Sequence, residues 1–216
     1  MQQYVCDSGM ILRSEPYSEY DRRVVILTKD HGKITAFAKG ARRQGNRLTA
    51  ATDLFCFAEY KLYAGKESYT LVDATVKTYF DELRGDMEAA LYGMYFLEVM
   101  EYQTRENNDE EQLLILLYMA CKALTNAQID RKLVKSVFEI KTVVLQGEFR
   151  QKYEGNYCES TQYTMDFIVN TSAKKLFTFM LKEEPLREII EIANNIRHNT
   201  WKHEFKSEAM LQIMSS

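Results

Sequence analysis

The sequence has few residues that break or loosen a chain, with 2 prolines and 9 glycines among 216 residues. This composition excludes a linker-like or low-complexity segment. Nothing at the N-terminus resembles a signal peptide, and no apolar run reaches the length of a transmembrane helix. The four cysteines form no CxxC pair, and Cys56 and Cys121 lie in apolar runs typical of buried positions. We therefore expect a protein of the reducing cytoplasm with no membrane partner.

Catalytic signatures are also missing. His31, His198 and His203 show no HExxH or HxH spacing and fit surface positions, and no GxSxG or Cys/His signature occurs. Residues 40–47, GARRQGNR, resemble a phosphate-binding glycine loop only superficially, because they lack the Lys-Ser/Thr pair and link two predicted strands. We expect no enzyme, no metal site and no cofactor.

The charge that is present is unevenly distributed. Residues 1–80 carry 12 Lys and Arg against 9 Asp and Glu, whereas residues 81–216 carry 16 against 22. The hydrophobic content of 46% is that of an ordinary globular protein. The asymmetry between the two parts, more than the net charge of −3, points to a basic functional surface in the first part.

The first 80 residues show the pattern of β-strands. Apolar, β-favouring runs cover residues 10–17, 23–28, 34–39, 53–63 and 69–76, with Gly32 able to form the turn between the second and third. Along the third run Ile34, Ala36 and Ala38 share one face, which leaves Phe37 and Lys39 on the other. Five short strands predict a small closed β-barrel over residues 1–80.

The apolar period becomes helical from about residue 80. Helices are predicted over residues 87–98, 113–124, 130–147 and 176–181, and a last one is predicted from Pro185 to residue 196. Residues 148–170 show no clear period. The sequence therefore predicts an α+β multidomain protein, with an all-α helical domain over residues 81–216.

A basic stretch, residues 29–47, stands out in the barrel domain. It contains six basic residues and only one acidic residue, Asp30. Arg22 and Arg23 begin the neighbouring predicted strand. Lys and Arg neutralise phosphates, and an aromatic such as Phe37 offers a stacking platform for an unpaired base. OB-folds hold single strands on such a face. The alternatives left open are a solvated loop without a ligand, a protein-interaction adaptor and an RNA-binding OB module.

Three segments resemble one known family. Residues 11–22 (ILRSEPYSEYDR), 28–33 (TKDHGK) and 38–43 (AKGARR) resemble the N-terminal signature of the bacterial DNA repair family RecO, and residues 92–98 are similar to its first helix after the barrel. The resemblance implies an N-terminal OB-fold, a helical C-terminal domain and a non-enzymatic mediator of the RecF pathway. Such a protein binds single- and double-stranded DNA and anneals complementary strands. It associates with RecR and with single-stranded DNA-binding protein (SSB), and it helps RecA to load on SSB-coated DNA in the cytoplasm, at the nucleoid.

The resemblance also implies that DNA contacts the basic residues of the barrel. Lys33 and Lys39 are expected on a rigid strand, and Arg42, Arg43 and Arg47 on a mobile loop that orders when DNA binds. The predicted nucleic-acid-binding residues are Arg13, Arg22, Arg23, Lys29, Lys33, Phe37, Lys39, Arg42, Arg43 and Arg47.

One departure from the family pattern concerns zinc. Many members of the family carry a zinc-binding cysteine cluster in the C-terminal domain, whereas the corresponding region here, about residues 146–170, contains only Cys158. One thiolate cannot complete a tetrahedral site, so we predict a degenerate zinc-finger region without metal. Tyr153, Tyr157 and Tyr163 are expected to hold this region together by packing.

Overall fold

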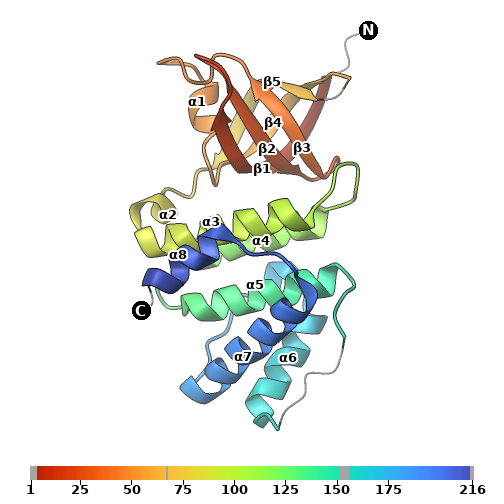
Figure 1. Ribbon diagram of the computed structural model, residues 1–216, viewed down its shortest axis with the longest axis vertical. Helices are drawn as coiled ribbons and strands as arrows, with labels where there is room; N and C mark the ends of the chain where they lie inside the picture. The colour runs from red at the N-terminus through yellow and green to blue at the C-terminus, as the bar shows by residue number, and fades with distance from the viewer. Residues whose placement is uncertain (1–3, 67, 151–155, 215–216) are drawn as a thin grey trace. The chain divides into compact units, whose positions relative to one another are not determined.

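The computed structural model describes residues 4–66, 68–150 and 156–214 (Figure 1). The chain divides into two compact units. The first consists of Met1–Asp81 with Phe96–Leu114, and the second of Glu82–Tyr95 with Ile115–Ser216. The first unit therefore contains the predicted barrel together with a later segment of the chain. Within the described ranges, no helix is both long and apolar enough to cross a membrane.

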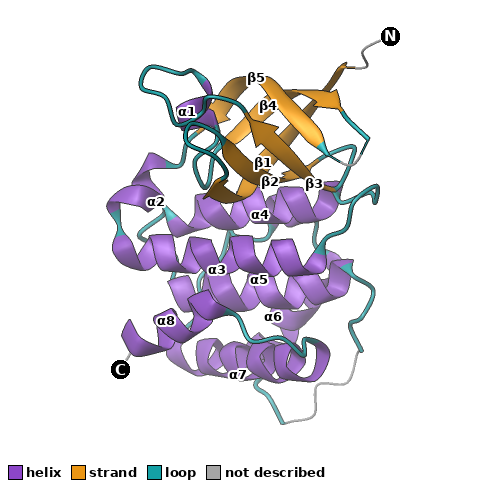
Figure 2. Cartoon of the chain, turned by 45° about the horizontal axis from the view of Figure 1, so that its top comes forward, coloured by secondary structure: helices purple, strands orange, loops and turns teal. Residues whose placement is uncertain are grey.

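The first unit is built on a closed barrel of five strands, drawn in orange in Figure 2. The strands are β1 (Tyr4–Pro16), β2 (Arg22–Thr28), β3 (Lys33–Ala38), β4 (Phe57–Ala64) and β5 (Tyr69–Thr78). Their order around the barrel is β1-β2-β3-β5-β4, and every pairing is antiparallel except the parallel pair of β3 and β5. This architecture confirms the predicted OB-fold barrel followed by helices.

Side-chain alternation explains how the barrel closes. Ile34, Ala36 and Ala38 are at most 1% exposed, as predicted, and they lie in one apolar cluster with the inward residues of the other strands. Strand β1 pairs with β4 through its first half and with β2 through its second half, and its register with β2 shifts between Ile11 and Arg13. Such an irregularity lets one long strand bend enough to serve both neighbours.

Several strand boundaries differ from the prediction. Strand β1 begins at Tyr4 instead of residue 10, and β3 ends at Ala38, so Lys39 lies in the following turn. The predicted strand 53–63 begins only at Phe57, because Phe55 has a positive φ of 65° and the chain turns there. A short helix, α1 (Leu48–Ala51), lies between β3 and β4 and was not predicted.

The turn between β2 and β3 is fastened to the segment of residues 104–110. Gly32 forms a β-bridge with Glu106, and the Lys33 N–H donates to the Arg105 carbonyl at 2.9 Å. Gly32 has a φ of +66°, and a Cβ at this position would lie 2.3 Å from the Arg105 carbonyl oxygen. Only glycine fits this position without displacing backbone.

The second unit is helical. Its elements, the first three of which share residues with the first unit, are α2 (Asp81–Gly85), α3 (Met87–Gln103), α4 (Glu111–Leu124), α5 (Arg131–Leu145), α6 (Glu159–Asn170), the 3₁₀ turn η1 (Ala173–Lys175), α7 (Glu183–Thr200) and α8 (Lys206–Met214). Asp130 caps α5 by accepting hydrogen bonds from the Lys132 and Leu133 N–H groups at 2.7 and 3.2 Å. The prediction of helices at α3, α4, α5 and α7 is confirmed.

Two predictions about this unit are wrong. Residues 176–181 form no helix but an irregular segment after η1, and residues 159–170, expected to lack a period, form helix α6. Helices α2 and α8 were also not predicted. The rule that alternating or helical apolar spacing identifies elements fails here, because short segments dock through few side chains.

Helix α6 lies in the predicted degenerate zinc-finger region, of which residues 151–155, with Tyr153, are outside the described residues. Its first turn is tied to α7, since the Cys158 N–H donates to Glu188 at 3.1 Å, and its last turn is tied to α5, since the buried Lys141 ammonium donates to the Ile168 and Val169 carbonyls at 3.1 and 2.9 Å. Tyr163 is 73% exposed, so it does not hold this region by packing. The buried side chains of Met165 and Ile168, together with these hydrogen bonds at both ends of α6, hold the helix in place.

Candidate nucleic-acid interface

Two loops at one end of the barrel carry a group of exposed aromatic and basic side chains. One loop, residues 17–21, joins β1 to β2, and the other, residues 39–47, joins β3 to α1. Phe37 on β3 lies beside them. We call this group the aromatic–basic rim, and it consists of Tyr17, Tyr20, Phe37, Lys39, Arg42 and Arg43.

Backbone contacts fasten the two loops to each other. The Arg42 N–H donates to the Tyr20 carbonyl at 2.9 Å, and the Gly40 N–H donates to Asp21 Oδ1 at 2.8 Å. The hydrogen bond from Gly40, more than the nearby charges of Lys39 and Arg43, holds the pKa of the Asp21 carboxyl below its ordinary value. The predicted mobile loop is thus a series of hydrogen-bonded turns in this structure.

The aromatic rings of the rim are positioned by one another and by arginine. The rings of Tyr17 and Phe37 lie 4.5 Å apart between centroids, and the Arg43 guanidinium lies 4.7 Å above the Tyr20 ring. Tyr17 is 62% exposed and Tyr20 41% exposed. A half-exposed ring held by a second ring is a pre-organised surface on which a planar base can stack.

The rim cations retain their charge toward solvent. Lys39, Arg42 and Arg43 are exposed, and none of them lies within 4.0 Å of a carboxylate oxygen of a described residue. Arg42 instead donates to the Ser18 and Glu19 carbonyls at 2.9 and 3.3 Å, which fixes its position without neutralising it. Three unneutralised cations beside exposed rings define a surface suited to a polyanion that carries planar groups.

Arg23 and Arg47 flank the rim. Arg23 pairs with Phe37 across β2 and β3 and lies 3.9 Å from Glu15. Arg47, whose side chain is 70% exposed, donates to Asp73 on β5 at 3.1 Å. Both side chains reach solvent, but each already has a carboxylate partner.

Arg22 occupies a different environment. Its guanidinium donates to Asp53 at 2.7 Å, to the Thr52 hydroxyl at 2.9 Å and to the Thr49 carbonyl at 3.0 Å. Only 22% of the side chain is exposed. Arg22 therefore anchors helix α1 and the residues that follow it to the barrel through its Nη1 group.

The remaining predicted residues, Arg13, Lys29 and Lys33, form what we call the hairpin-tip cluster. Within the first unit, Arg13 pairs with Glu101 at 2.9 Å and Lys29 with Glu111 at 3.5 Å. The Lys33 ammonium donates to the Glu101 carbonyl, and burial lowers the pKa of this ammonium. The structure thus places four of the ten predicted residues in the exposed rim, whereas the other six, which include this cluster, already have acidic or carbonyl partners.

Tyr17 and Tyr20 were not predicted as site residues. Their signal was available, since tyrosines in a short loop directly after Pro16 are unlike the buried aromatics of a strand. His31 was expected at the surface, yet it is half-buried and its Nδ1 lies 2.7 Å from the buried carboxylate of Asp7. Within the described ranges, no three His, Cys, Asp or Glu residues gather as a metal site.

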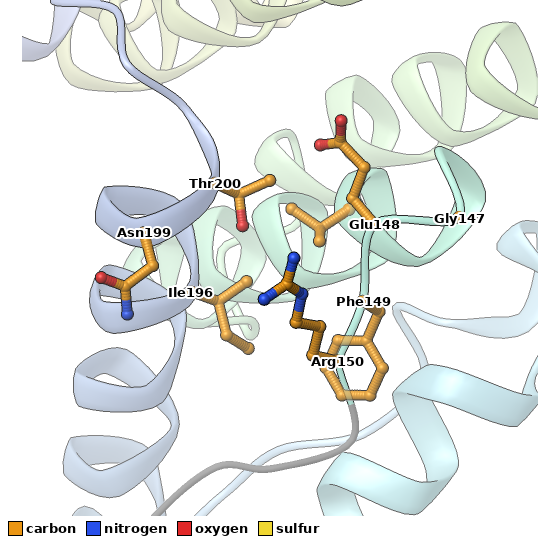
Figure 3. Close-up of a pocket in the computed structure, with 8 residues that line it drawn as sticks. Gly147, Glu148, Phe149, Arg150, Ile196, Asn199 and Thr200 are labelled. Atoms are coloured by element: carbon orange, nitrogen blue, oxygen red, sulfur yellow. The ribbon is translucent and has the colours of Figure 1, made fainter.

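The second unit contains a polar pocket of about 700 Å³ between the end of α5 and the last turns of α7 (Figure 3). Arg150, Asn199 and Thr200 line it together with apolar side chains such as Ile196. Glu148 and Arg150 both line the pocket, so its lining does not favour a ligand of one charge over the other. Arg150 immediately precedes residues 151–155, which are outside the described residues, so the pocket carries no assignment.

Fold and site together define an OB-type barrel protein with an attached helical region and an exposed aromatic–basic rim. Comparison with known proteins identifies the family. The model of "Recombination protein O N terminal" matches residues 1–80, and that of "Recombination protein O C terminal" matches residues 84–149. The chain belongs to the RecO family.

Relatives that match most of the chain carry the name "DNA repair protein RecO". The one from Clostridium novyi (strain NT) is 27% identical over 90% of this chain and 84% of its own length. The one from Clostridium perfringens (strain 13 / Type A) is 26% identical over 95% of this chain and 96% of its own. A relative from Acetivibrio thermocellus is 32% identical over 67% of this chain and 57% of its own.

Proposed function

We propose that this chain is a non-enzymatic recombination mediator in DNA repair, and that its aromatic–basic rim binds DNA. The observation that carries the proposal is the exposure of Lys39, Arg42 and Arg43 without carboxylate partners, beside Tyr17 and Tyr20. The family and the name of the relatives support the role in repair and recombination.

Binding in this proposal depends on phosphates and not on sequence. Arg and Lys that neutralise phosphates release condensed counterions, which gives sequence-tolerant and salt-sensitive affinity. Tyr17 and Tyr20 then favour a strand whose bases are free to stack, so single strands bind more tightly than duplex at equal charge. Two complementary strands that are neutralised and kept with free bases anneal faster than they do in solution.

The partners of the proposed mediator follow from the family resemblance. It associates with RecR, engages SSB and helps RecA to load on SSB-coated single-stranded DNA. Such a protein works in the cytoplasm, at the nucleoid. The basic residues of the hairpin-tip cluster take no direct part in DNA contact, since Glu101 and Glu111 already offset their charge.

Two alternatives belong to other classes: a protein-interaction adaptor whose barrel face takes a peptide, and an RNA-binding OB module. A fluorescence titration with single-stranded DNA, duplex DNA and RNA at two salt concentrations separates them. The proposal predicts binding of both DNA forms with strong salt dependence. An adaptor binds none of the three, and an RNA module prefers RNA over DNA of the same sequence.

The rim assignment has its own test. Arg42→Glu with Arg43→Glu should weaken binding of every DNA sequence alike and flatten the salt dependence. The matched control is Lys174→Glu with Lys175→Glu. These two exposed lysines are adjacent to each other in η1 of the second unit, and the variant has the same change of charge. If the rim variant binds as tightly as the control, this loop is not the DNA contact.

A further inference from the structure

A second aromatic–basic surface lies on the barrel, outside the rim. Tyr4 and Tyr63 face each other across the antiparallel pair of β1 and β4, with ring centroids 5.8 Å apart. The Lys61 ammonium lies 5.2 Å from the centroid of the Tyr4 ring. We call these three residues the tyrosine–lysine patch.

Strand alternation directs this patch outward. Ala58, Tyr60 and Leu62 of β4 are fully buried in the barrel core, so Lys61 and Tyr63 belong to the opposite face. Tyr4 is 49% exposed, and Cys6, which pairs with Lys61 across the strands, is exposed as well. The four side chains therefore share one continuous outer surface.

Lys61 differs from Lys77, the other basic residue of β4 and β5. Lys77 lies 3.7 Å from Glu59, whereas the Lys61 ammonium lies over the Tyr4 ring, and Asp73, which pairs with Lys61 across β4 and β5, accepts from Arg47. A cation over a ring keeps its full charge, and the ring keeps a face for stacking when the flexible lysine moves to a phosphate. This pairing of ring and cation is the chemistry that holds single-stranded nucleic acid without reading its sequence.

The patch and the rim have no residue in common and lie at different ends of their strands. The rim loops follow β1 and β3, whereas the patch lies on the first residues of β1 and the last residues of β4. Strand β5 separates β3 from β4 in the barrel order. Figures 1 and 2 show the beginning of β1 on the opposite side of the barrel from α1, which follows the rim loop.

We propose that the tyrosine–lysine patch is a second binding surface for single-stranded nucleic acid, which holds the second strand during annealing. The inference rests on the proposed function, since the rim holds the first strand. A single surface can hold one strand, but annealing requires two strands at high local concentration with their bases free. The patch supplies the second position on the same barrel.

Cys6 provides a direct probe of this surface in the unmodified protein. It is exposed next to Lys61, whereas Cys56 and Cys121 are buried and Cys158 is half-buried in the second unit. Alkylation is followed at each cysteine by mass spectrometry, with and without a saturating oligothymidine of about eight nucleotides, within the site sizes of OB-folds. Because a bound strand covers the outer surface around Cys6, the proposal predicts that the saturating oligonucleotide slows alkylation of Cys6 and leaves the alkylation rate of Cys158 unchanged.

Variants separate this inference from the proposed function. Protection of Cys6 should persist in the variant with Arg42→Glu and Arg43→Glu, and it should disappear with Tyr4→Ala and Lys61→Glu. Tyr4→Phe keeps the ring and should keep the protection, and Lys77→Glu serves as the control for charge on an exposed strand. The annealing rate should fall in the patch variant while the rim still binds one oligonucleotide.

The other outcomes each overturn a defined claim. If the oligonucleotide binds at the rim and leaves Cys6 unprotected, the second surface does not exist and the proposed function stands. If the rim variant also loses protection at Cys6, one strand wraps around the barrel and there is no independent second position. If the unmodified protein binds no oligonucleotide, both proposals fail.

Discussion

The hairpin-tip cluster and the rim both carry basic side chains, but those of the cluster have partners in residues 101–111, whereas those of the rim are exposed to solvent. At the hairpin tip, Arg13, Lys29 and Lys33 meet acidic side chains or carbonyls of residues 101–111. At the rim, the cations are held by carbonyls and a tyrosine ring and keep their charge toward solvent. One continuous basic stretch in the sequence therefore holds the fold together at its beginning and leaves exposed the cations that we propose bind DNA at its end.

This difference shows why clustered charge in a sequence is a weak guide to a binding surface. Carboxylates that neutralise a cation lie far along the chain, as Glu101 does from Arg13 and Glu111 from Lys29, while a cation held by carbonyls, such as Arg42, keeps its full field.

The largest effect is expected at the hairpin tip. Gly32→Ala places a Cβ 2.3 Å from the Arg105 carbonyl oxygen at a φ of +66°, so we expect the free energy of unfolding to fall by at least about 3 kcal/mol. Gly45→Ala in the rim loop is the matched control, because its φ is +75° and nothing lies within 4 Å of the new Cβ. It should cost about 1–2 kcal/mol. Urea denaturation measures both, and equal costs would show that the tip is not a fastened contact.

A smaller effect is expected from the rings of the rim. Tyr17→Ala removes the exposed ring that packs on Phe37 and should weaken binding of single-stranded DNA by about 1–3 kcal/mol while leaving duplex binding nearly unchanged. Tyr17→Phe preserves the ring and should bind as the unmodified protein does. Fluorescence anisotropy with matched single and double strands measures the difference. An equal loss for both DNA forms would assign Tyr17 to loop structure instead of stacking.

The smallest effect concerns the tie between the rim loops. The pKa of Asp21 is lowered from 3.8 mainly by the Gly40 N–H, so the ionised carboxylate stabilises the folded state above that pH. This contribution is lost as the pH falls through the lower, folded-state pKa. Asp21→Asn should therefore lower the melting temperature slightly at pH 7, and the difference from the unmodified protein should vanish in acid. A difference that does not shrink as the pH falls below 3.8 would contradict this origin.

Much of the fold was predictable because local patterns and tertiary packing agree. The alternation of Ile34, Ala36 and Ala38 predicted the inner face of β3, and Asp130 marked the start of α5. Segment 53–56 was mistaken for strand because its residues favour strands, whereas the turn at Phe55 depends on its contacts in the fold. The apolar residues 176–181 were mistaken for a helix because spacing alone does not distinguish a helix from an irregular segment that packs on a neighbouring element, as Phe179 does on Phe167 of α6.

The sequence predicted which basic residues belong to the candidate site, but not which of them stay exposed and which are held by partners. The basic stretch identified the loop that carries Arg42 and Arg43, while the roles of Arg22 and Lys33 depend on Asp53 and Glu101, which lie 31 and 68 residues away. Such pairings arise from the closure of the barrel and leave no local signal. The tyrosine–lysine patch is similar, since Tyr4 and Tyr63 become neighbours only through the pairing of β1 with β4.

The salt dependence of DNA binding tests the central claim most directly. Two variants remove two charges each from the same basic stretch: Lys29→Ala with Lys33→Ala at the tip, and Arg42→Ala with Arg43→Ala at the rim. For single-stranded DNA, the slope of log K against log salt should become shallower by about 1.4 in the rim variant, since each phosphate contact contributes about 0.7. The tip variant should keep the slope of the unmodified protein. A flattened slope in the tip variant with an unchanged slope in the rim variant would contradict the account.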